Sequence, residues 1–198
     1  MKNQLINPLQ GLISKASTSL AKQTGHVAQA QERITRIQNR PSVVLADVSG
    51  SMASSAWGGH TKHAVLREAI AATLQTANHQ LIAFSDRVTP VTSAASLPPA
   101  DGGTALHLAL DAAIARDPGR ILVISDGEPD NEAAALAVAA RFKGVIDVLY
   151  IGPDSNAAAM RFLQRLALAG HGRFHGSDIS RAGQPALAHS IQLLLPKS

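Results

Sequence analysis

Short, wholly apolar runs alternate along the chain with longer segments in which apolar residues recur at helical spacing. Val43-Val44-Leu45-Ala46 and Ile121-Leu122-Val123-Ile124 are runs of the kind that form strands buried on both faces of a sheet. In the segments between such runs, apolar residues fall every three or four positions, which is typical of amphipathic helices. This alternation predicts an α/β fold, with a doubly wound, mostly parallel sheet and helices on both faces.

The alternation can be divided into individual elements. A short strand at 87–91 contains Pro90, which cannot donate to a strand ladder, so we expect it at an edge of the sheet, as its one antiparallel strand, followed by a loop at 92–101. The other predicted strands are 42–47, 80–84, 120–125, 145–151 and a short one near 173–175, and the predicted helices are 60–78, 104–116, 131–142, 156–169 and 183–194.

The first 40 residues lie outside this alternation and are predicted to form a helical arm. Apolar residues recur there at helical spacing with an interruption near Gly25, which indicates one bent helix or two short ones ending before Pro41. We therefore divide the chain into an arm, 1–40, and an α/β domain, 41–198. The apolar stripe needs cover from the domain, a second copy or another protein; it comprises Leu9, Leu12, Ile13, Ala16, Leu20, Val27, Ala30, Ile34 and Ile37.

The arm also carries the net positive charge of the protein. It holds six lysines and arginines against Glu32 alone, whereas the other 158 residues hold 12 basic and 13 acidic side chains. A basic arm can bind nucleic acid or another acidic surface, and an acid-poor, Arg-containing start is also a property of organellar transit peptides. The arm has no aromatic residue for base stacking, so we favour a helical arm that packs on the domain or a partner and keep nucleic-acid binding as an alternative.

The composition excludes some classes of site and segment but does not identify a compartment, for which cytoplasmic is the default. The chain has no cysteine, which excludes disulfides and thiolate metal sites, and no stretch approaches the roughly 20 apolar residues of a membrane span. The first residues also lack the apolar core of a secretory signal. We expect a cytoplasmic protein with no membrane span.

Oxygen-bearing side chains follow two of the predicted strands. Asp47, Ser49 and Ser51 alternate in the turn after the first strand, Asp126 follows strand 120–125, and Thr104 stands at a helix start after two glycines. In doubly wound sheets, ligands bind outside the carboxyl ends of the strands where the strand order reverses. Carboxylate and hydroxyl oxygens gathered there suit a hard divalent cation such as Mg²⁺.

These residues resemble the von Willebrand factor A (VWA) domain family with its metal-ion-dependent adhesion site (MIDAS). Asp47, Ser49 and Ser51 match the D-x-S-x-S motif of the family, Thr104 its second-loop threonine and Asp126 its third-loop aspartate, in a region covering roughly residues 42–194. The resemblance implies that the three hydroxyls bind Mg²⁺, with Mn²⁺ as the alternative. It also implies that the two aspartates bind directly or through water and that a partner's Asp or Glu fills an open position.

The function implied by the resemblance is that of a metal-dependent protein-interaction module, or adaptor, of the intracellular microbial type and not an enzyme. By family analogy the partner is an AAA+ ATPase of the MoxR type. Beyond the resemblance, Trp57 lies in a loop of small residues just after the metal-binding serines, where we expect it to be partly exposed and to bind the partner. The alternative role for Trp57 is to cover the start of the next helix.

Enzymatic alternatives have weaker support. A haloacid-dehalogenase-like phosphatase needs a second carboxylate where Ser49 stands, and the chain has neither a G-x-S-x-G elbow nor a phosphate-binding P-loop. The pairs His60 and His63, and His171 and His175, have helix-like spacing but no third zinc ligand nearby, so we interpret them as surface or capping residues. Asp101, Glu128 and Asp130 are interpreted as loop or helix-start carboxylates.

Overall fold

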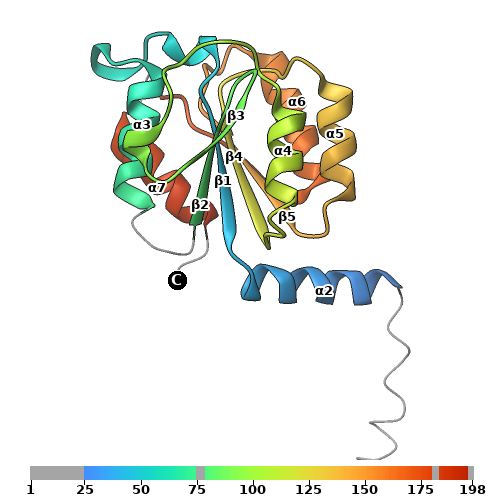
Figure 1. Ribbon diagram of the computed structural model, residues 1–198. Helices are drawn as coiled ribbons and strands as arrows, with labels where there is room; N and C mark the ends of the chain where they lie inside the picture. The colour runs from blue at the N-terminus through green and yellow to red at the C-terminus, as the bar shows by residue number, and fades with distance from the viewer. Residues whose placement is uncertain (1–24, 75–78, 180–182, 196–198) are drawn as a thin grey trace, which may run out of the picture.

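One sheet organises the part of the chain that the computed structural model describes, residues 25–74, 79–179 and 183–195. Its strand order is β3-β2-β1-β4-β5-β6, and all neighbouring strands are parallel except the pair β2 and β3. This confirms the predicted doubly wound fold, including the antiparallel edge strand with Pro90 (Figure 1). The strands are β1 (Ser42–Asp47), β2 (His79–Phe84), β3 (Val88–Val91), β4 (Arg120–Ser125), β5 (Val145–Tyr150) and β6 (His171–Gly176).

Helices cover both faces of this sheet (Figure 1). Helices α3 (Lys62–Thr73) and α7 (Gln184–Leu194) pack on one face, and α4 (Leu106–Ile114), α5 (Glu132–Arg141) and α6 (Ala157–Ala169) pack on the other. Alternate residues of β1 enter the two cores, with Val43 and Leu45 on the α4 side and Val44 and Ala46 on the α3 side. Burial of the central strands on both faces explains their unbroken apolar sequence.

Two helices begin two residues later than the sequence predicts, for local reasons. Helix α3 begins at Lys62 and not at residue 60, because Thr61 is its N-cap and accepts a hydrogen bond from the backbone N–H of Ala64. It ends at Thr73, and residues 75–78 of the predicted helix lie outside the described residues. Helix α4 begins at Leu106 because the backbone of Thr104 is hydrogen-bonded to Asp130 in a neighbouring loop.

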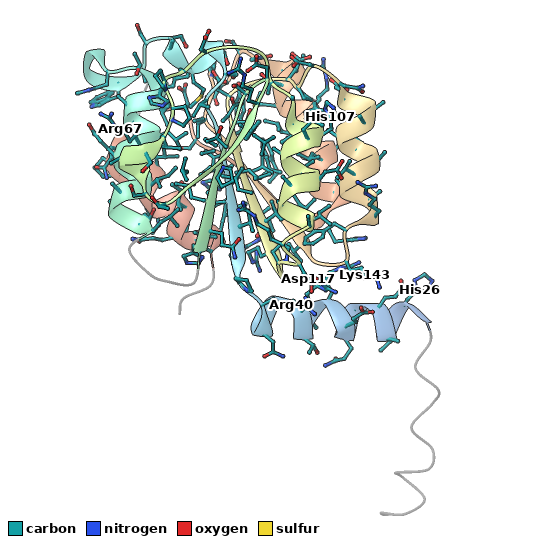
Figure 2. All side chains as sticks on the ribbon, in the orientation of Figure 1. His26, Arg40, Arg67, His107, Asp117 and Lys143 are labelled. Atoms are coloured by element: carbon teal, nitrogen blue, oxygen red, sulfur yellow. The ribbon has the colours of Figure 1, made fainter. Side chains whose placement is uncertain are left out.

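Helix α2 (Gly25–Asn39) lies across the end of the domain where strand β1 begins (Figure 1). It ends two residues before Pro41, as predicted, whereas residues 1–24 of the predicted arm fall outside the described residues. Arg36 and Arg40 form ion pairs with Asp117, which lies just beyond α4 (Figure 2). The described part of the arm therefore contacts the domain, at the end away from the carboxyl ends of the parallel strands. Among the described helices, none has the length and apolar content required to cross a bilayer.

Candidate metal-binding site

Three loops meet at the carboxyl ends of β1 and β4, the two strands at which the strand order changes direction. The loop after β1 is joined to the loop before α4 by two backbone hydrogen bonds, Gly50 N–H to the carbonyl of Gly102 (3.0 Å) and Asp101 N–H to the carbonyl of Val48 (2.9 Å). Gly102 has a φ of +80°, and a Cβ there would lie 2.7 Å from Oδ1 of Asp86. Only glycine fits this turn, which brings the second loop onto the first.

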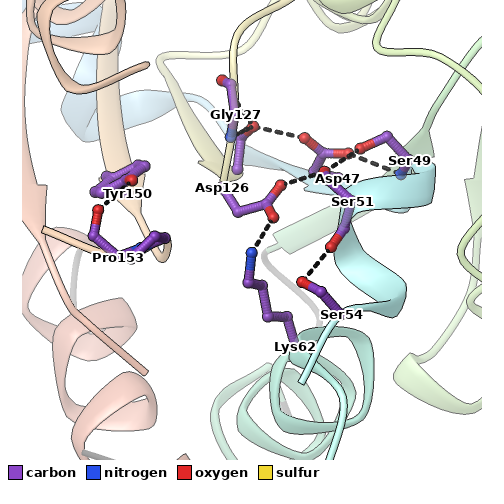
Figure 3. Close-up of polar contacts among 10 residues, drawn as sticks. Asp47, Ser49, Ser51, Ser54, Lys62, Asp126, Gly127, Tyr150 and Pro153 are labelled. Carbon is purple, nitrogen blue, oxygen red and sulfur yellow. Dashed lines mark hydrogen bonds and ion pairs between the residues drawn. The ribbon is translucent and has the colours of Figure 1, made fainter. Parts of the chain in front are cut away.

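Asp47 is the most deeply buried charged group of the cluster, with no exposed surface. Its Oδ1 accepts a hydrogen bond from the backbone N–H of Ser49 (2.8 Å), and its Oδ2 accepts one from the hydroxyl of Ser125 (2.5 Å) (Figure 3). Burial raises the pKa of Asp47 to about 6, these hydrogen bonds oppose the rise, and the charge of Asp126 adds to it. Both carboxylate oxygens are thus occupied by protein donors that hold the loop in place.

Ser49, Ser51 and Asp126 form a continuous chain of oxygens beside Asp47 (Figure 3). The hydroxyls of Ser49 and Ser51 are 3.2 Å apart, and the Ser51 hydroxyl donates to Oδ1 of Asp126 at 2.7 Å. Ser49 and Asp126 are almost fully buried, whereas Ser51 is exposed. The cluster therefore opens to solvent on the Ser51 side.

Thr104 is tied to this cluster through its backbone. Its N–H donates to Oδ2 of Asp130 (2.9 Å), and its carbonyl accepts from the N–H of Asp130 (3.1 Å). These two bonds hold the loop before α4 against the loop after β4. The structure thus brings the loops of Asp47, Ser49, Ser51, Thr104 and Asp126 together, and the direction of the Thr104 hydroxyl toward a metal remains a prediction.

Sequence reasoning missed three residues of the site: Ser125, Asp130 and Lys62. Ser125 and Asp130 act inside the cluster, on Asp47 and Thr104 respectively. Lys62, the first residue of α3, reaches Oδ2 of Asp126 with its Nζ at 2.5 Å (Figure 3). For Ser125, the sequence offered one signal, which is its position next to Asp126 at the end of a strand. For the contact between Lys62 and Asp126 it offered none, because the two residues are 64 positions apart.

The donor set suits a hard divalent cation. In an octahedral magnesium site with bonds of about 2.1 Å, neighbouring ligand oxygens lie about 3.0 Å apart. The separations along the chain of oxygens, 3.2 and 2.7 Å, bracket that value. Among the described residues there is no group of three or more His, Cys, Asp or Glu side chains placed for a metal ion, so a metal held here would depend on hydroxyl oxygens in addition to carboxylates.

Trp57 lies six residues after Ser51, in the loop that follows β1, and is 53% exposed. Its backbone N–H donates to the carbonyl of Ile179 (3.0 Å), in the segment between β6 and α7. One edge of the indole ring rests on Gly183, where a Cβ would lie 2.6 Å from Cδ1 of the ring. Trp57 is therefore partly exposed, as predicted, and its covered edge packs on the segment before α7.

The comparisons with known proteins agree with this architecture. The sequence model of the family described as "VWA domain containing CoxE-like protein" matches residues 16–169, most of the chain. VWA domains are protein-interaction modules. No curated protein matches the sequence significantly.

Solved structures share the fold at low sequence identity. The chain is similar to manganese-loaded TRAP protein of Plasmodium vivax, with a TM-score of 0.57 and 17% identity over 82% of this chain and 76% of that one. It is also similar to the SpRpn10 VWA domain, with a TM-score of 0.58 and 13% identity over 80% and 98% of the two chains. A third similar structure is the vWF domain of the type V pili tip protein Mfa5 of Porphyromonas gingivalis, with a TM-score of 0.50 and 11% identity over 80% and 97%.

Proposed function

Because the chain belongs to the family of VWA domain containing CoxE-like proteins, we propose that it is a metal-dependent protein-interaction module that captures an acidic side chain of a partner. The observation that carries the proposal is the chain of oxygens formed by Ser49, Ser51 and Asp126 at the carboxyl ends of β1 and β4. It combines the ligand chemistry of a hard cation with an opening to solvent at Ser51.

In this proposal Ser49, Ser51 and Thr104 hold the metal with their hydroxyls, and Asp126 binds it directly or through water. Asp47 acts in support, because its two oxygens already accept from Ser49 and Ser125. Mg²⁺ is the expected ion, with Mn²⁺ as the alternative; manganese loading of the TRAP structure is a property of that protein and supports the class of ion only by analogy. A bound ion supplies an electrophilic centre, since neutral hydroxyls offset little of its charge.

The partner is expected to contribute an Asp or Glu carboxylate to the metal and an apolar side chain to the exposed part of Trp57. By family analogy it is an AAA+ ATPase of the MoxR type, and the location is cytoplasmic. Arg36 and Arg40 are engaged with Asp117, so the described basic part of the arm supports docking on the domain in preference to nucleic-acid binding.

We assign the protein no catalytic activity. In the cluster, Ser49 stands where a phosphatase of the D-x-D type needs its second carboxylate. Asp47 is buried with both oxygens in hydrogen bonds, so it is not presented as a nucleophile.

Titration calorimetry with MgCl₂ and MnCl₂, followed by affinity capture in Mg²⁺ or in chelator, tests the proposal. We expect one metal per chain and a partner that is retained only with metal. Ser51→Ala should abolish both, whereas Ser96→Ala, which removes an exposed hydroxyl bonded to Ser93, should change neither. Absence of metal binding by the unmodified protein would refute the proposed site.

A further inference from the structure

The ammonium of Lys62 contacts the carboxylate oxygen of Asp126 that does not accept the hydrogen bond from Ser51. Ser51 donates to Oδ1 at 2.7 Å, and Lys62 Nζ lies 2.5 Å from Oδ2. Figure 3 shows this ion pair. The side chains of Lys62 and Asp126 are 14% and 1% exposed, so the pair is largely shielded from water. Shielding strengthens the attraction between the two charges and makes either one costly to leave unpaired.

The helix itself gives no reason for a cation at this position. Lys62 is the first residue of α3, where the positive end of the helix dipole disfavours positive charge. Capping is provided by Thr61, whose hydroxyl accepts from the N–H of Ala64 at 3.1 Å. The contact that accounts for a lysine here is therefore the one with Asp126.

A divalent cation at the chain of oxygens would face Oδ1 of Asp126, while the Lys62 ammonium contacts Oδ2 of the same carboxylate. The two positive charges would repel each other at this short range and compete for one negative charge. The lysine has space into which it can move. It lines a hollow of about 200 Å³ beside the site, whose walls include Ser54, Ser55, Pro153 and Ile179. Its ammonium can therefore move off Asp126 while its backbone stays fixed by the hydrogen bond from its own N–H to the carbonyl of Ser54 (3.0 Å).

From this geometry we propose that Lys62 is a tethered counter-ion that competes with the divalent metal for Asp126 and so sets the metal affinity of the site. The inference rests on the metal-binding function proposed above. In protein kept in chelator, Lys62 neutralises the buried carboxylate; when metal binds, the ammonium withdraws into the adjacent hollow. The lysine thereby lowers the affinity for metal and keeps the loops folded without it.

Replacement of the charge by an unbranched, uncharged side chain of similar length tests this. Lys62→Met should bind Mg²⁺ about 5- to 20-fold more tightly than the unmodified protein in titration calorimetry. In chelator its melting temperature should be lower, because Asp126 loses its counter-ion, and the rise in melting temperature on adding Mg²⁺ should be larger. Arg67→Met, which removes an exposed charge from the same helix (Figure 2), is the control and should leave the metal affinity within about twofold.

Lys62→Gln provides a second variant that keeps a hydrogen-bond donor for Asp126 without the charge, should Lys62→Met fold poorly. It too should bind Mg²⁺ more tightly. Equal or weaker metal binding by the folded variants, with the unmodified protein still binding metal, would overturn this inference alone and indicate that Lys62 supports the site. Absence of metal binding in all of these proteins would overturn the proposed function as well.

Discussion

The hydroxyl of Ser125, at the end of β4, donates a 2.5 Å hydrogen bond to Oδ2 of Asp47, at the end of the neighbouring strand β1. The bond links the two strands whose loops form the candidate site, and it lies in a fully buried position. The other carboxylate oxygen of Asp47 accepts a hydrogen bond from the N–H of Ser49, so both oxygens have a protein donor. A buried carboxylate of this kind affects both the stability of the domain and the way its loops hold a cation.

The first prediction concerns pH and stability without metal. Asp47 has an ordinary pKa of 3.8 and a folded-state pKa of about 6, so the folded protein binds its proton more tightly than the unfolded chain. The stability contributed by this group is therefore fully present below pH 4 and is lost as the pH rises through 6. Asp47→Asn should not show this loss. The free energy of unfolding of the variant, relative to that of the unmodified protein, should therefore increase by up to about 3 kcal/mol between pH 4 and pH 7. Urea unfolding in metal-free buffers measures the difference in the free energy of unfolding between the two proteins. A difference that does not vary with pH would contradict the raised pKa of Asp47.

The second prediction concerns the same residue and the metal. Asp47→Ala should weaken Mg²⁺ binding about 10- to 100-fold, because outer ligands that hold metal-binding loops commonly contribute this much. The domain should stay folded, since the substitution also removes a buried negative charge close to Asp126. Calorimetric titration with Mg²⁺ and circular dichroism of the same samples check both statements. Unchanged affinity in the variant would sink the site assignment.

Trp57 carries the third prediction. Trp57→Ala should weaken partner binding by about 2 kcal/mol, because an exposed tryptophan in the loop that carries the proposed metal-binding serines is a typical interface hot spot. Mg²⁺ affinity and melting temperature should change little, since 53% of the residue is exposed. Leu168→Ala on α6 is the control, because Leu168 is also apolar and is 77% exposed. Binding is measured with the partner identified by affinity capture; a large fall in melting temperature with intact binding would assign Trp57 to covering the segment at Gly183 instead.

The fourth prediction concerns the arm. A chain of residues 41–198 should fold with a melting temperature within a few degrees of the full chain, because the sheet and both cores lie within it. Helix α2 is linked to the domain by surface ion pairs, each worth about 0–1 kcal/mol, and its Val27 and Ile34 remain half exposed. Thermal unfolding of the truncated chain measures this effect.

Asp117→Asn in the full chain is the matched control for the truncation, because it removes the ion pairs of Arg36 and Arg40 while asparagine tolerates the positive φ of 51° at this position. Its melting temperature should fall by no more than that of the truncated chain. Failure of residues 41–198 to fold would show that the arm belongs to the core.

Much of the fold follows from local sequence patterns. The apolar runs at 42–47 and 120–125 could be recognised as buried strands, and Pro90 placed its strand at the sheet edge, because burial and hydrogen-bonding capacity act residue by residue. Helix ends were predicted less well. Helix α4 begins two residues later than predicted because Asp130, from another loop, holds the backbone of Thr104.

The sequence by itself determined the strand–helix alternation, and thus that Asp47 and Asp126 end strands, together with the hydroxyl pattern of Ser49 and Ser51. Only the tertiary structure decided which groups these carboxylates contact. Asp47 meets Ser125 across 78 positions, and Asp126 meets Lys62 across 64. The physical reason is that side-chain periodicity specifies the face on which a residue lies, whereas a contact between distant residues depends on which strands are neighbours, on their register and on where a helix begins.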